Sequence, residues 1–252
     1  MSHSGFESLA THQQFIIASK KWRANILYIF ERMIFLSKFG GWKAKFSKNF
    51  PQKVASAVSD DLMILGATYD PVAYLGYQQV NGTNHAVLAE QTITNGKDTK
   101  NAVMMIFNEK PSSNDISLVN VRTIAESGGD LGGLNVSVTT DIPQEAMDAF
   151  AAATEGFVGS KIVPVAYLGS QVVKGINYEM IAEITPVTLN AKTDLALITV
   201  NGLDKTIKFE RVFELGDKEA TALGYAFTWL KNGKKVSAES KVALNTPLGE
   251  WP

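Results

Sequence analysis

An internal repeat constrains this chain more than any other feature of its sequence. Residues 71–92 and 164–185 are identical at 13 of 22 positions when they are aligned at an offset of 93. Upstream, residues 40–52 align with residues 132–144 at an offset of 92 and share the Gly-Gly and Pro-Gln pairs. Two matched blocks in the same order indicate that a whole unit of roughly 92 residues is duplicated.

Each copy of the repeat predicts one strand followed by one helix. Residues 42–46 alternate apolar and polar side chains, as a strand does. Pro51 and Pro143 stand where proline is favoured, in the first turn of a helix. Apolar residues at helical spacing follow in both copies: Val54, Ala57, Val58 and Leu62 in the first, and Ala146, Ala149, Phe150 and Ala153 in the second.

Four strand-like runs follow the helix in each copy, and turn-rich segments separate them. They are about 71–80, 83–93, 101–107 and 116–124 in the first copy, and about 162–173, 176–187, 194–200 and 206–214 in the second. An antiparallel sheet of this kind buries one face against a helix. We therefore predict an α+β fold.

The repeat also predicts the domain organisation. We expect a helical extension at 1–38, a first domain at 39–126, a glycine-rich linker at 127–131, a second domain at 132–215 and a C-terminal extension at 216–252. Apolar residues at helical spacing predict a helix over about 12–37, and residues 219–231 are compatible with a short helix.

The composition excludes several kinds of site. The chain has 252 residues, 45% hydrophobic and 19% charged, so a packed core is feasible. The absence of cysteine excludes a disulfide, a zinc–thiolate site and a cysteine nucleophile. The 24 basic and 25 acidic residues nearly balance, so we expect no nucleic-acid partner. Of the three histidines, only His85 lies in the repeat, where we expect a strand residue without special chemistry, and we predict no metal site, cofactor or enzyme.

No apolar run is long enough to predict a membrane span. Residues 24–36 follow basic residues and resemble a signal peptide, but Glu31 and Arg32 interrupt the apolar run. No convincing cleavage site of small residues precedes Gly40. We therefore expect a cytoplasmic protein.

The pentapeptide Gln-x-Val-x-Gly occurs once in each copy. It reads Gln78-Gln79-Val80-Asn81-Gly82 in the first and Gln171-Val172-Val173-Lys174-Gly175 in the second. It falls at the junction of the first two strands after the helix, where a hairpin must turn. Glycine at the end of the turn adopts a positive φ without steric cost, so the valine is held near the tip and faces outward.

These features resemble the cystatin family over about residues 40–215. Cystatins carry Gln-x-Val-x-Gly in their first hairpin loop and a glycine, often paired, just before their first strand. Here Gly40-Gly41 and Gly132-Gly133 occupy that second place. The run 82–84, Gly-Thr-Asn, and the absence of cysteine are similar to the stefins, a type without disulfides. The resemblance implies two tandem cystatin-like domains, each with a helix packed on a curved antiparallel sheet of about five strands.

The resemblance implies reversible inhibition of papain-like cysteine proteases by physical occlusion. In that mechanism a trunk of glycines, which lets the backbone approach the enzyme closely, and the hairpin form one edge of a wedge that enters the active-site cleft. The implied protease-binding residues are the two glycine pairs and the two pentapeptides: Gly40, Gly41, Gln78, Gln79, Val80, Asn81, Gly82, Gly132, Gly133, Gln171, Val172, Val173, Lys174 and Gly175. Secreted cystatins also place Pro-Trp in a second loop, and only Pro111 in the first copy resembles that feature.

Two other interpretations stay open. A non-inhibitory binding or structural module on the same fold is the main alternative, because a fold does not determine a function. The glycine pairs would then serve only as turns. An enzyme is a distant third, since no converging set of titratable groups is visible. An inhibitor needs its trunk and hairpin tip exposed, and this requirement separates the first two interpretations.

Overall fold

The computed structural model describes residues 41–59, 66–94, 99–113, 115–128, 132–187, 189, 191–213, 228–231 and 234–237. The helix predicted over about 12–37 and the glycine at position 40 lie outside these residues. The chain divides into two units, Met1–Gly41 and Trp42–Pro252, and the second holds both copies of the repeat from Trp42 onward. Within the described residues, no helix has the length and apolar character needed to cross a membrane.

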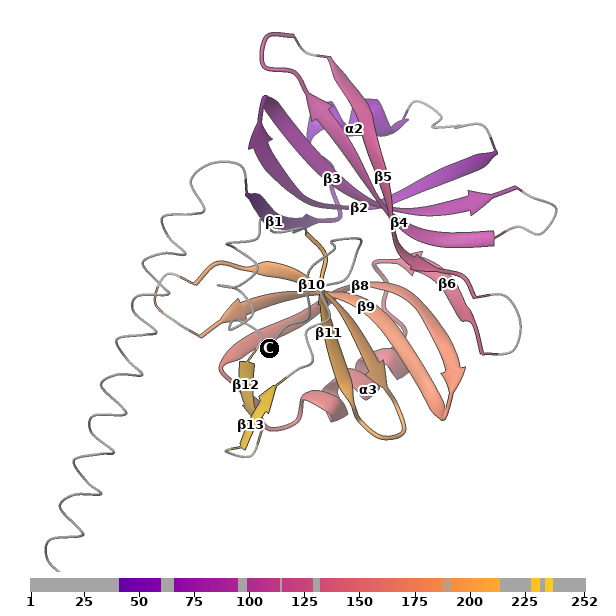
Figure 1. Cartoon of the computed structure of the whole chain (residues 1–252), viewed down its shortest axis with the longest axis vertical. Coiled ribbons are helices and arrows are strands. Elements are labelled where there is room, and N and C mark those ends of the chain that lie inside the picture. Colours follow the sequence, from indigo (N-terminus) through magenta and orange to yellow (C-terminus); the bar gives the residue numbers. More distant parts are fainter. Residues whose placement is uncertain are drawn as a thin grey trace, which may run out of the picture. The chain divides into compact units, whose positions relative to one another are not determined.

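The first copy folds into one helix and a five-stranded antiparallel sheet (Figure 1). Its elements are β1 (Trp42–Ser47), α2 (Gln52–Ser59), β2 (Ala67–Val80), β3 (Gly82–Ile93), β4 (Thr99–Glu109) and β5 (Ile116–Glu126). The strands lie in the sheet in chain order, with β1 paired to β2 although the helix separates them in sequence.

The second copy repeats this arrangement. Its elements are β6 (Leu134–Thr139), α3 (Gln144–Thr154), β8 (Ser160–Val173), β9 (Gly175–Pro186), β10 (Asp194–Asn201) and β11 (Ile207–Arg211). The sheet order is again the chain order, from β6 through β8, β9 and β10 to β11. The α+β prediction is therefore confirmed, and the predicted strands match the observed ones to within a few residues.

The C-terminal part of the chain corrects one prediction. Residues 228–231 form a strand, β12 (Thr228–Lys231), where the sequence was compatible with the end of a short helix over 219–231. β12 pairs with β13 (Lys234–Ser237) and with β7 (Phe157–Val158), which precedes β8. The sequence between β12 and β13 is Asn-Gly, the strongest short hairpin signal, and it explains why a strand replaces the helix. Residues 219–227 lie outside the described part of the chain.

Each helix packs on one face of its own sheet. The apolar face predicted for α3 is buried in full, and in α2 Val54 is buried while Ala57 and Val58 pack against the same cluster. Leu62 lies outside the described residues. The strands contribute alternate side chains to these clusters, led by Val87, Met105 and Phe107 in the first copy and by Met180, Ile198 and Phe209 in the second.

The opposite faces of the two sheets bury their side chains in a single apolar cluster. We call it the shared cluster. Its large members include Leu75, Leu88, Met104 and Ile106 from the first copy and Leu168, Ile181, Leu195 and Leu197 from the second. Three of these pairs stand at the repeat offset of 93: Leu75 with Leu168, Leu88 with Ile181, and Met104 with Leu197. Each sheet is thus buried on both faces, whereas we had predicted burial of one. The uninterrupted apolar run at 102–107 is typical of a strand buried on both sides.

Candidate functional site

The start of β1 and the pentapeptide of the first copy lie at the same end of its sheet. β1 pairs antiparallel with β2, and Trp42 lies opposite Gln78. Gly41 directly precedes Trp42 in the chain but belongs to the other unit, and Gly40 lies outside the described residues.

The second copy brings the same segments together. Leu134 at the start of β6 lies opposite Gln171 at the end of β8. The side-chain Nε2 of Gln171 donates a hydrogen bond of 2.7 Å to the carbonyl oxygen of Gly132. This hydrogen bond joins the trunk to the hairpin that carries the pentapeptide.

Both hairpin tips are exposed. Val80 is 48% exposed, and Val172 and Val173 are 70% and 43% exposed. The polar residues around them are exposed as well: Gln79, Asn81 and Lys174. The outward orientation predicted for the valines of the two tips is therefore confirmed.

A second hairpin loop lies against the glycine that ends each pentapeptide. A Cβ atom on Gly82 would overlap the carbonyl oxygen of Glu109 and lie 3.3 Å from Cδ of Pro111. A Cβ atom on Gly175 would lie 2.6 Å from Cβ of Leu203. Both glycines also have a positive φ, 99° and 91°, which residues with side chains rarely adopt. Glycine is therefore required at each of these positions for two reasons: the turn needs a positive φ, and the second loop approaches too closely for a side chain.

Each copy thus assembles three segments at one end of its sheet, and we name these surfaces. Edge 1 consists of residue 42 with residues 78–82 and 109–113, and edge 2 consists of residues 132–133, 171–175 and 201–205. All residues of edge 1 belong to the first copy, and all residues of edge 2 belong to the second.

A ladder of amide side chains lies behind each tip. Asn84 Nδ2 donates to Gln78 Oε1 at 3.1 Å, and Asn108 Nδ2 donates to Asn84 Oδ1 at 2.8 Å. The ladder crosses three neighbouring strands, β2, β3 and β4. The second copy has the same amides at the offset of 93, joined in the same way: Gln171, Asn177 and Asn201. A network that satisfies its own donors and acceptors holds the tip in one conformation.

In edge 2 the last amide of the ladder also organises the second loop. Asn201 is 7% exposed, and its Nδ2 donates to the carbonyl oxygen of Lys174 at 3.2 Å. Its Oδ1 accepts hydrogen bonds from the backbone N–H groups of Leu203 at 2.9 Å and Asp204 at 3.0 Å. One buried side chain therefore connects the hairpin tip, the ladder and the second loop.

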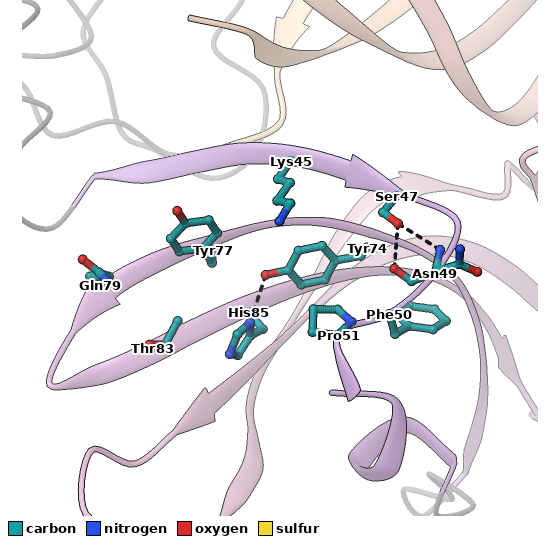
Figure 2. Close-up of a pocket in the computed structure, with 10 residues that line it drawn as sticks. All are labelled: Lys45, Ser47, Asn49, Phe50, Pro51, Tyr74, Tyr77, Gln79, Thr83 and His85. Carbon is teal, nitrogen blue, oxygen red and sulfur yellow. Dashed lines mark hydrogen bonds between the residues drawn. The ribbon is translucent and has the colours of Figure 1, made fainter. Parts of the chain in front are cut away.

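In edge 1 the second loop is held by charged groups. Lys53 of α2 forms an ion pair with Glu109, and His85 Nε2 lies 3.3 Å from the same carboxylate. The hydrogen bonds from Lys53 and then from His85 lower the pKa of Glu109. The other ring nitrogen of His85, Nδ1, lies 2.9 Å from the hydroxyl oxygen of Tyr74 (Figure 2). Burial, with a smaller contribution from Tyr77, raises the pKa of Tyr74 well above its usual range.

His85 is thus a strand residue as predicted, but it is not without partners. It is 8% exposed and joins β3 to the end of β4 through Glu109. This polar network borders a pocket of about 510 Å³ that β1, β2, β3 and the segment before α2 line (Figure 2). The lining residues are Lys45, Ser47, Asn49, Phe50, Pro51, Tyr74, Tyr77, Gln79, Thr83 and His85. The described residues contain no group of three histidine, aspartate or glutamate side chains placed to hold a metal ion.

A contact inside the chain accounts for one trunk glycine. A Cβ atom on Gly133 would overlap backbone atoms of Gly128, and the N–H of Gly128 donates to the carbonyl oxygen of Leu134 at 3.2 Å. Gly128 of the predicted linker therefore packs directly against the trunk of edge 2. This packing gives Gly133 a structural reason to lack a side chain, beside the approach to an enzyme that the resemblance implies.

Several residues of the edges were not predicted. Asn84 belongs to the run that resembles the stefins, but Asn108 carries no known motif. Each asparagine of the ladder recurs at the repeat offset, so a comparison of the two copies position by position would have found them. Glu109 and Leu203 have no such signal, because the second loops differ in sequence and length between the copies.

Comparison of the chain with protein-family models, with curated proteins and with solved structures found no match. The resemblance described above therefore depends on the residues of the two edges and on the order of the elements that carry them.

Proposed function

We propose that this chain is a reversible inhibitor of papain-like cysteine proteases, built from two cystatin-like units. One observation carries the proposal. In each copy the start of the first strand, which the glycine pair precedes in sequence, lies with an exposed Gln-x-Val-x-Gly tip and a second hairpin loop at one end of the sheet. Edge 1 and edge 2 are the proposed docking surfaces.

The apolar side chains of the tips supply the contacts. Edge 2 presents Val172, Val173 and Leu203, which are exposed between 43% and 70%. Edge 1 presents Val80 and the exposed Pro111, which lies against Gly82. A typical inhibitor interface buries roughly 1,600 Å² in total, and exposed apolar side chains at its centre supply most of the binding energy.

The amide ladders support the proposal through their effect on entropy. A tip that is ordered before binding loses little conformational freedom when the enzyme closes around it. The chain also reverses at Asn81, so the pentapeptide does not offer the cleft one continuous extended strand, as a substrate would. The edge therefore blocks the cleft without being cleaved.

The experiment is an inhibition assay against papain with a small peptide substrate. The intact chain should slow the enzyme at micromolar concentration or below. The combined variant Val80→Asp, Val172→Asp and Val173→Asp should weaken inhibition by about 100-fold or more, because it places a charge at the centre of each contact. A chain that leaves papain unaffected at micromolar concentration would disprove the proposal.

Two controls keep the result interpretable. Val119→Asp changes a valine that is 56% exposed on β5, outside both edges, and should leave inhibition unchanged. Thermal unfolding followed by circular dichroism should show that both variants keep their fold. Substitutions of Gly82 or Gly175 are less suitable, because a side chain there would collide with the second loop.

The alternative is a non-inhibitory binding or structural module. The contact between Gly133 and Gly128 favours this alternative, because it gives a trunk glycine a structural role within the chain. In that case the valine variants would change partner binding but no protease would be inhibited, so the same assay separates the two functions.

A further inference from the structure

The trunk of edge 2 lies at the end of the first sheet that is remote from edge 1. Ser127, which follows β5, donates from its N–H to Oδ1 of Asn101 at 3.1 Å. The next residue, Gly128, packs against Gly133 of the trunk. Asn101 stands at the start of β4, whereas edge 1 uses the last residue of that strand, Glu109. The length of β4 therefore separates edge 1 from the trunk of edge 2.

The reverse relationship holds for edge 1. The ring of Trp42, which follows its trunk, stacks on Phe213 with 4.8 Å between ring centroids and 6° between planes. The neighbouring Val212 donates from its N–H to the carbonyl oxygen of Leu195 at 3.4 Å. Leu195 stands at the start of β10, whereas edge 2 uses the last residue of that strand, Asn201.

These two sets of contacts are equivalent under the repeat. β1 lies against β10 and β6 lies against β4, and each pair joins corresponding strands of the two copies. Such reciprocal contacts are those of a two-fold relationship between the copies. Because each trunk lies at the far end of the other sheet, the two edges lie at opposite ends of the shared cluster. At about 3.3 Å per residue, the stretch of β4 from Asn101 to Glu109 spans roughly 26 Å.

We propose that one chain binds two papain-like protease molecules at once, one on each edge, and that the two sites act independently. This inference rests on the proposed function. Each edge is complete within its own copy, and its tip is exposed while the other copy is in place. The two copies pack on each other through the buried shared cluster, which fixes their relative orientation. The two edges therefore cannot face the same enzyme molecule. Two enzymes at opposite ends do not compete for space.

The test is the stoichiometry of the complex. Papain of known active fraction is titrated with the intact chain, and the mass of the complex is measured by light scattering during gel filtration. We expect two enzyme molecules per chain. The variant Val80→Asp should bind one, through edge 2, and the variant Val172→Asp with Val173→Asp should bind one, through edge 1. The Val119→Asp control should still bind two.

The outcomes distinguish this inference from the proposed function. If the intact chain stops at one enzyme molecule while each single-edge variant also binds one, the edges exclude each other and the inference is wrong. In another outcome, the intact chain and one single-edge variant each bind one enzyme molecule, and the other variant binds none. Only one edge is then active, so this inference is wrong although the proposed inhibition stands. If the intact chain binds no enzyme, the proposed function itself fails.

Discussion

The two edges have the same plan, but different chemistry holds their second loops in place. In edge 2, the buried Asn201 connects the loop to the tip through neutral hydrogen bonds. In edge 1, the loop is held by Glu109, which is paired with Lys53 and His85. The two copies therefore have the same arrangement of tip and second loop, although different interactions hold the loop in each copy. The neutral, buried version should contribute more to stability and should depend less on pH and salt.

The alignment of the two copies shows which residues account for this difference. Lys53 corresponds to Glu145 in the second copy, and His85 corresponds to Tyr178. The pair that holds the loop of edge 1 therefore has no counterpart in edge 2. Instead, burial and then the charge of Glu145 raise the pKa of Tyr178. Each prediction below tests one difference between the copies.

The largest difference should appear when the matching asparagines of the ladders are removed. Asn201→Ala leaves the carbonyl oxygen of Lys174 and two backbone N–H groups without their partner. Asn108→Ala removes the hydrogen bond to Asn84. We expect the free energy of unfolding in urea to fall by about 2–3 kcal/mol for the first variant and by about 1 kcal/mol for the second. Equal losses would show that the two loops are held equally well.

The next difference concerns the glycines that end the pentapeptides. In Gly82→Ala, the new methyl group meets a backbone carbonyl oxygen, that of Glu109, which can move only with its strand. In Gly175→Ala, the overlap is smaller, 2.6 Å to Cβ of Leu203, and this atom can move only with the exposed second loop that carries it. Both variants also strain a backbone of positive φ. We expect losses of about 2 kcal/mol and about 1 kcal/mol, measured by thermal unfolding. A larger loss for Gly175→Ala would contradict this account.

Much of each edge was predictable because local signals agree with the fold. The repeat, the prolines before the helices and the turn glycines predict the elements and place the trunk and the tip at one end of each sheet. The shared cluster was not predictable in the same way. An apolar strand face indicates burial, but it does not tell whether a helix, a second copy or another chain covers it. Long-range contacts such as Trp42 with Phe213 leave no periodic signal.

Glu179 shows why a comparison of the copies needs the structure. It corresponds to Ala86, which belongs to the shared cluster, so a carboxylate replaces a methyl group at one of two matching positions. The residue is partly buried beside Leu134 and Gln171 of edge 2. Burial, and then the charge of Glu210, raise the pKa of Glu179.

The third prediction follows from this shift. A carboxyl group whose pKa is raised by folding binds its proton more tightly in the folded state, so the stability of the protein falls as the pH rises through the folded-state pKa. Glu179→Gln removes this penalty. We expect the variant to melt at a higher temperature than the intact chain at pH 7 and to lose that advantage near pH 4. Glu210→Gln should give part of the same effect, because it removes the smaller cause. A gain that does not change with pH would show that packing, not charge, is responsible.

The smallest effect should come from the ion pair of edge 1. The pKa of Glu109 is lowered in the folded protein, so its contribution to stability is present above the unfolded-state pKa of a glutamate and is lost as the pH falls through the folded-state pKa. The pair is partly exposed to solvent, and we expect Glu109→Gln to cost less than about 1 kcal/mol at pH 7 and nothing at low pH. A double-mutant cycle with Lys53→Met, measured by urea unfolding in low and high salt, isolates the pair. A coupling energy that persists in high salt would mean that edge 1 is held as firmly as edge 2.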